Sequence, residues 1–290
     1  MNETKDIKIP IKAIVEQQMN MNGAKYEEDE FNLLRKYFIA CLNLGYLKPD
    51  DLNTMVGKFA SQIKFIVLNY NNMNKLDYYV INGSVLYING MVKDSNSELY
   101  EISFYKAVSE VIFKASDKYV SFSTLICQMV AEKIYNMDTN ASRIILPSLV
   151  YEKIGEVTHN VRSGYLNYSL LISLLKQLLI SKKINENILI RNLYFEGIEK
   201  AYNTYFEDST SRLLLEVLDK ILLLYINFRM KNDTNPSLNK LIEKYQIIVN
   251  DFFKNKDVEY FAFLALVTTD ELREKLAKTI NNDESGDKDE

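Results

Sequence analysis

The chain has 290 residues, of which 47% are hydrophobic and 26% charged, a composition typical of a folded globular protein. Its net charge is −4, and no basic stripe runs along it, so we expect no nucleic-acid partner. The N-terminal segment lacks the apolar core of a secretory signal, and the most apolar run, 213–228, carries three charged residues. We therefore expect a cytoplasmic protein without a membrane span.

The first part of the chain predicts a polar arm followed by a helical hairpin. Residues 1–24 are mixed and polar, and we expect a flexible arm there. Residues 26–44 have acidic residues in their first turns and apolar residues at helical spacing, and they predict a helix that ends at Gly45. A second helix is predicted over 50–69, after Pro49.

A β-hairpin is predicted next, at about 77–88. The runs 77–81 and 84–88 are rich in β-branched and aromatic residues, and they flank Asn82-Gly83. Asn-Gly suits a type I′ turn, in which both central residues need positive φ. Because two strands alone are marginal, we expect the hairpin to pack on helices or to pair with further strands.

Nearly everything after Ser97 predicts helix. The fold class is therefore mainly α: a single helical domain over 25–280 with one hairpin, followed by a disordered acidic tail at 281–290. The predicted helices cover 98–115, 121–136, 142–157, 165–182, 186–206, 210–230, 236–255 and 257–280.

The helix predicted over 98–115 is apolar over a wide arc and has one narrow polar stripe. Such a helix usually lies deep in a domain. The stripe has two interpretations. It either faces solvent, with Lys106 and Glu110 as an i,i+4 ion pair, or it lines a cleft. Its members are Ser103, Lys106, Ala107, Glu110 and Lys114.

The layout around this helix resembles that of the helical zinc metallopeptidases called zincins, in their thermolysin-like, gluzincin form. There a strand pair precedes a helix with His-Glu-x-x-His, whose two histidines bind zinc and whose Glu is the general base. A second helix adds a third ligand. The matching segments here are KAVSE, 106–110, and TLICQMVAEKIY, 124–135. The resemblance aligns Lys106, Ala107, Glu110 and Thr124 with the first His, the Glu, the second His and the third ligand.

None of the zincin catalytic residues is present at these positions. A protonated lysine is a poor zinc ligand, and alanine is no base. The resemblance therefore implies a zincin-like protein without zinc chemistry, with no catalytic residue, metal or cofactor. Its relic cleft would bind a peptide or protein partner, with strand 84–88 as the edge. The residues lining it would be Ser103, Lys106, Ala107, Glu110, Thr124 and Gln128.

Other clusters carry weaker functional signals. Cys41 and Cys127 lie in apolar surroundings and predict buried free thiols, and His159 is the only histidine. The carboxylates Glu196, Glu199, Glu207 and Asp208 predict a solvated face, and the aromatic series 194–206 predicts core packing. Two further functions stay open: an enzyme with unrecognised carboxylate or metal chemistry, and a helical scaffold without a cleft.

Overall fold

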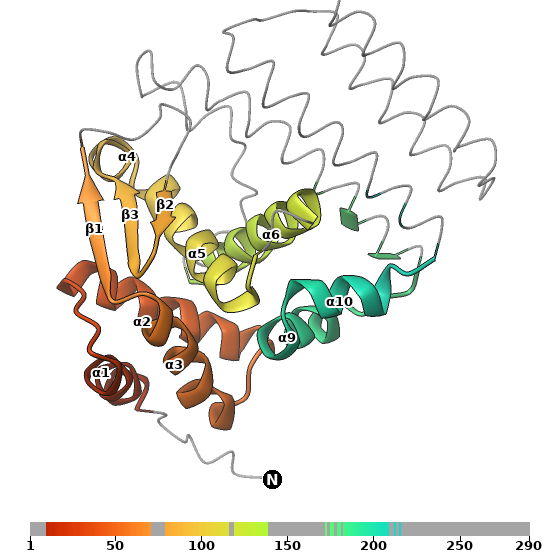
Figure 1. Cartoon of the computed structure of the whole chain (residues 1–290), viewed down its shortest axis with the longest axis horizontal. Coiled ribbons are helices and arrows are strands. Elements are labelled where there is room, and N and C mark those ends of the chain that lie inside the picture. Colours follow the sequence, from red (N-terminus) through yellow and green to blue (C-terminus); the bar gives the residue numbers. More distant parts are fainter. Residues whose placement is uncertain are drawn as a thin grey trace, which may run out of the picture.

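The computed structural model describes residues 10–70, 79–115, 119–138 and 182–208, together with single positions between 172 and 180 and between 212 and 215. The described chain is mainly helical with one small sheet, as predicted (Figure 1). Its elements are α1 (Ile11–Asn22), α2 (Glu28–Asn43), the 3-10 turn η1 (Pro49–Asp51), α3 (Leu52–Gln62), β1 (Phe65–Asn69), β2 (Tyr79–Asn82), β3 (Val85–Asn89), α4 (Gly90–Ser95), α5 (Ser97–Phe113), α6 (Val120–Asp138), α9 (Glu186–Glu196) and α10 (Ile198–Tyr205).

The described residues 10–24 correct that part of the predicted flexible arm at 1–24, and residues 1–9 lie outside the described residues. Residues 11–22 form α1, whose Ile11 and Val15 are buried against the helices that follow. Gly23 ends this helix with φ of 65°, and its N–H donates to the carbonyl of Asn20. Ile11 and Val15, one turn apart, give this short helix an apolar face that packs on the domain. The other residues of the segment are mostly polar, which is why the sequence predicted a flexible arm.

The helical hairpin forms as predicted, but its second helix is shorter than 50–69. α3 ends at Gln62, and the rest of the predicted helix is the strand β1. The sequence Phe-Ile-Val-Leu satisfies helical and strand patterns equally well, because a short apolar run does not distinguish them. Pairing with β3 decides the outcome, since a parallel partner needs an extended strand.

The predicted hairpin is present, with a register one residue later than expected. β2 and β3 are antiparallel, and Asn82 pairs with Val85, so the two turn residues are Gly83 and Ser84. Gly83 has φ of 58°, whereas Ser84 has negative φ, which is the pattern of a type II′ turn. The predicted type I′ turn centred on Asn82-Gly83 is therefore wrong.

The sheet has three strands in the order β1-β3-β2 (Figure 1). β3 is its centre, paired parallel with β1 and antiparallel with β2. The inner face, including Ile66, Leu86 and Ile88, is buried on the helices. α5 and α6 lie beyond β2, and α2 and α3 lie below the sheet (Figure 1).

The predicted helices over 98–115 and 121–136 are confirmed as α5 and α6. The helix predicted over 186–206 is broken at Gly197 into α9 and α10. In the described part of the chain, no helix is long and apolar enough to cross a membrane. The following predictions lie wholly or mostly outside the described residues: the helices over 142–157, 165–182, 210–230, 236–255 and 257–280, and the tail.

Candidate functional site

The helix with the polar stripe, α5, is placed by two caps and is buried along most of its length. The Asn96 side chain accepts a hydrogen bond from the Leu99 N–H at 3.0 Å, and Lys114 ends the helix with φ of 55°. Ser103 is only 3% exposed and Ala107 is fully buried. Lys114, at the end of the helix, is exposed, but the rest of the stripe is buried or half-buried, whereas the first interpretation required the stripe to face solvent.

Lys106 and Glu110 form the predicted ion pair, at 3.9 Å, at the border of the core. Their side chains are 13% and 20% exposed. The Lys106 ammonium also lies 5.9 Å from the centre of the Tyr79 ring, which belongs to β2. At that distance a cation and an aromatic ring attract each other. The Lys106–Glu110 ion pair thus lies between α5 and β2, the antiparallel strand of the sheet.

α6 brings a thiol to the same place. α5 and α6 make the most extensive contact between helices among the described elements. Cys127 is fully buried on α6. Burial raises the pKa of its thiol most, the Glu110 carboxylate raises it further, and Lys106 lowers it. The charges of both stripe residues therefore act on Cys127, so the two predicted helices converge here.

The remaining two predicted residues lie one turn apart on α6. Gln128 is 3% exposed, and its amide donates to Glu132 at 3.1 Å. Thr124 is half-buried, one turn before Gln128. The Lys106–Glu110 ion pair and Cys127 define the candidate site, which lies between α5, α6 and β2.

The edge of this site differs from the prediction. Strand 84–88 was expected to be the edge, but the corresponding strand, β3, has a partner on each side and is the centre of the sheet. β2 is the terminal strand next to α5. The sequence did not reveal this because β1 was assigned to a helix, which left the hairpin without its third strand.

The described residues contain no group of three or more His, Cys, Asp or Glu side chains arranged to hold a metal ion. His159 lies outside the described residues. Of the predicted carboxylate cluster, Glu196 pairs with Lys200 at 3.0 Å and Asp208 pairs with Lys182. These carboxylates therefore lie in ordinary ion pairs.

A second polar cluster, which the sequence did not locate, lies in the core between α2, α5 and α9. Cys41, Tyr37, Ser109 and Tyr194 are all fully buried. Tyr37 is 2.9 Å from the Ser109 hydroxyl and 2.7 Å from the Tyr194 hydroxyl, which is 2.9 Å from the Cys41 sulfur. Burial raises the pKa of the Cys41 thiol to about 12.

The direction of every hydrogen bond in this cluster follows from counting hydrogens. Ser109 donates its one hydrogen to the Tyr105 carbonyl at 2.9 Å, so it must accept from Tyr37. Tyr37 then has no hydrogen left, and it accepts from Tyr194. Tyr194 in turn accepts from the Cys41 thiol. The cluster is a one-way chain from Cys41 to the α5 backbone, and it ties three helices together.

At the N-terminal end of α2, the buried Glu30 binds residues of α4 and α5. Glu30, only 3% exposed, accepts from the Tyr100 hydroxyl at 2.7 Å and pairs with Lys93 at 3.4 Å. The wealth of tyrosine without tryptophan indicated that some hydroxyls must find buried partners, and Tyr37, Tyr100 and Tyr194 are such residues. These polar contacts fix α5 relative to α2.

No family model, no curated protein and no solved structure matches the chain.

Proposed function

We propose that the chain is a non-catalytic zincin-like protein that binds an extended peptide or protein segment beside β2. The observation that carries this proposal is the Lys106–Glu110 pair, at 3.9 Å, on a buried helix next to the terminal antiparallel strand. These are the two positions at which the zincins that the layout resembles hold zinc. Here an ammonium and a carboxylate neutralise each other in the place of a metal.

β2 offers the backbone that such a segment needs. The tight turn makes Asn82 and Val85 a hydrogen-bonded pair, so the next pair, Ile81 and Leu86, is of the non-hydrogen-bonded kind. The N–H and C=O of Ile81 therefore point away from β3. In the described part of the chain β2 has no strand on that side. An added strand would gain main-chain hydrogen bonds there.

The residue types at the aligned positions support binding without cleavage. In the zincin resemblance Ala107 aligns with the general base, and alanine has no group that exchanges a proton. Lys106 lies beside Glu110 and Tyr79, so a bound segment would meet this ion pair. From the composition and charge of the chain we also propose a cytoplasmic location, a peptide or protein partner and no nucleic-acid partner.

A peptide microarray tests this proposal. Wild-type protein and the double variant Lys106→Met/Glu110→Gln, which removes both charges with little change in shape, are incubated with immobilised extended peptides of random sequence. The matched control is Lys200→Met/Glu196→Gln, because that pair has the same i,i+4 spacing on the surface, with Lys200 67% exposed.

We expect the wild type and the surface control to bind the same peptides, and the stripe variant to lose or change its set. We also expect no cleavage of the bound peptides with zinc added. The absence of peptide binding by wild type, identical sets for all three proteins, or zinc-dependent cleavage would each refute the proposal. Native metal content, measured by elemental mass spectrometry without a histidine tag, tests the same point, since stoichiometric zinc contradicts it.

A further inference from the structure

Glu110 has few partners for a carboxylate that is largely buried. Its side chain is only 20% exposed, and the Lys106 ammonium lies 3.9 Å from it. That distance suits an ion pair but is too long for a hydrogen bond. In the part of the chain that the structure describes, no donor reaches the Glu110 carboxylate. By contrast, Glu30 and Asp51, whose side chains are 4% and 15% exposed, accept hydrogen bonds at 2.7 and 2.8 Å. Glu110 can therefore still accept from a donor on a bound molecule.

Two side chains of β2 lie on the same face of the sheet as this carboxylate. Tyr79 and Ile81 pair with buried residues of β3, so both project to the inner face of the sheet. The Lys106 ammonium lies 5.9 Å from the centre of the Tyr79 ring, which places the Lys106–Glu110 ion pair next to Tyr79. Ile81 is 39% exposed although it projects inward, and the described sheet has no strand beyond it. A segment added beside β2 would therefore meet an apolar side chain and, two positions along β2, a ring that leads to Glu110.

We propose that the segment bound beside β2 carries an apolar residue and, two positions later, an arginine that donates to the Glu110 carboxylate. This inference rests on the proposed peptide-binding function and specifies the chemistry of its partner. In an added antiparallel strand, the commoner kind of pairing, the residues opposite Ile81 and Tyr79 are two positions apart and project to the same inner face. The first residue packs on Ile81, and the second extends along the Tyr79 ring to Glu110.

Arginine suits this position better than the other donors. A long side chain is needed to reach past the Tyr79 ring to the carboxylate. A guanidinium has five donors in a planar fork and stacks on aromatic rings, whereas the lysine ammonium is a compact point charge. A carboxylate has about four acceptor positions, and Lys106 at 3.9 Å leaves the Glu110 positions open for a second cation. The net charge of −4 on the chain also favours a basic segment over an acidic one.

The peptide microarray separates this inference from the proposed function on which it rests. We expect the peptides bound by wild type to be enriched in an apolar residue followed two positions later by arginine. Bound peptides without this enrichment would overturn the inferred pattern and leave the peptide-binding function standing. A microarray on which wild type binds no peptide would overturn both.

Fluorescence anisotropy with four defined peptides tests the charge of the partner. The peptides share a threonine-rich frame with uncharged ends and one valine, which is followed two positions later by arginine, citrulline, lysine or glutamate. Citrulline keeps the shape of arginine but has no charge. We expect wild type to bind the arginine peptide at least about tenfold more tightly than the citrulline peptide, because hydrogen bonds to charged groups contribute at least that much. We expect the glutamate peptide to bind most weakly, and equal affinities for the four peptides would contradict the pattern.

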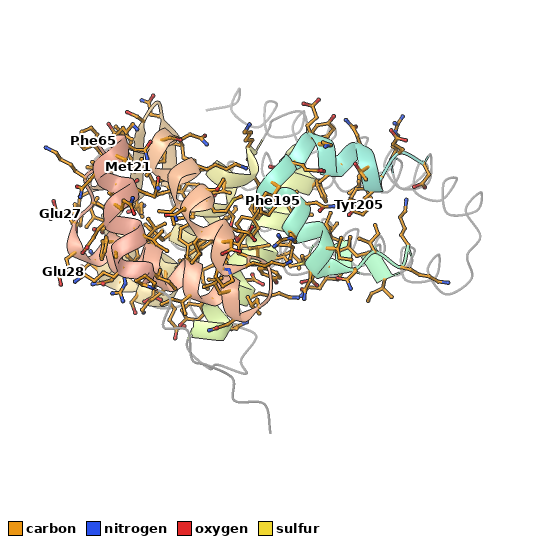
Figure 2. All side chains as sticks on the ribbon, turned by 90° about the horizontal axis from the view of Figure 1, so that it is seen from below. Met21, Glu27, Glu28, Phe65, Phe195 and Tyr205 are labelled. Carbon is orange, nitrogen blue, oxygen red and sulfur yellow. The ribbon has the colours of Figure 1, made fainter. Side chains whose placement is uncertain are left out.

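Two variants that each neutralise one carboxylate assign this preference to Glu110. We expect Glu110→Gln to bind the arginine and citrulline peptides with nearly equal affinity. The control is Glu196→Gln, because Glu196 also belongs to an i,i+4 ion pair, and Figure 2 shows its neighbour Phe195 well apart from Phe65 of the sheet. We expect this control to keep the full preference for arginine. A preference that survives Glu110→Gln would overturn the inference.

A second pair of variants tests the apolar position and does not depend on the stability of Glu110→Gln. Val80 and Ile81 are each 39% exposed, and they project to opposite faces of β2. We expect Ile81→Thr to weaken binding of the arginine peptide and Val80→Thr to leave it unchanged. Equal effects of the two substitutions would contradict the placement of the segment on the inner face.

Discussion

The one-way hydrogen-bond chain in the core predicts unequal costs for two substitutions of the same kind. Tyr37→Phe removes the acceptor of the Tyr194 hydroxyl and the donor to Ser109, and it leaves the buried Tyr194 O–H with only the weakly accepting Cys41 sulfur in reach. Tyr194→Phe leaves Tyr37 still donating to Ser109, and it strands only the weak donor of Cys41. A stranded buried group costs about 1–3 kcal/mol. We expect losses in the free energy of unfolding of about 2 kcal/mol for Tyr37→Phe and about 1 kcal/mol for Tyr194→Phe.

The double variant gives the sharper test. Once Tyr37 is phenylalanine, Tyr194→Phe removes a hydroxyl that has lost its acceptor, so the second change is nearly neutral. We expect the double variant to lose about 2 kcal/mol, which is about 1 kcal/mol less than the sum of the single losses. Urea unfolding of the four proteins measures this coupling. Additive losses, or a larger loss for Tyr194→Phe than for Tyr37→Phe, would refute the assigned directions.

Two further predictions concern the backbone and the thiols. Gly197 joins α9 to α10 with φ of 85°, and an added Cβ would lie 3.1 Å from the Phe113 carbonyl oxygen. We expect Gly197→Ala to lower the free energy of unfolding, measured with urea, by about 1–3 kcal/mol. A loss near zero would show that the backbone between the two helices adjusts to alanine without strain. Burial raises the pKa of Cys41 from 9.0 to about 12, so its contribution to stability is complete below pH 9 and is lost as the pH rises towards 12. We expect the midpoint of urea unfolding to fall between pH 8 and pH 10.5, and the native thiols to resist a thiol reagent at pH 8. A midpoint that rises with pH, or rapid labelling of the native protein, would contradict the burial of these groups.

Much of the helical part of the fold could be predicted from local pattern. The acidic first turn of α2 and the apolar arc of α5 each indicated the correct element, because these signals lie within one or two turns of chain. Asn89, which precedes Gly90 in a further Asn-Gly pair, ends β3, and its side chain accepts from the Met91 N–H at 3.0 Å. Such local capping is readable from sequence.

The predictions were wrong where residues distant in the sequence determine the local structure. The run at 65–69 became a strand only because β3 pairs with it, and 11–22 became a helix only because α2 and α3 cover it. The ion pair of the candidate site was predictable from its i,i+4 spacing. Its burial beside β2 was not, since Tyr79 is placed by the sheet and not by α5. The buried tyrosine chain joins residues far apart, and no local pattern marks it.

The contact between Tyr37 and Tyr194 spans 157 residues, and that between Lys58 and the Tyr194 carbonyl spans 136. Ribosomes add about 5–20 residues per second, so roughly 8–30 s pass between the synthesis of Tyr37 and that of Tyr194. During that interval α2 and α5 have been made, but α9 is not there to cover them. A growing chain therefore leaves Tyr37 and the apolar faces of α2 and α5 without their α9 partner for many seconds.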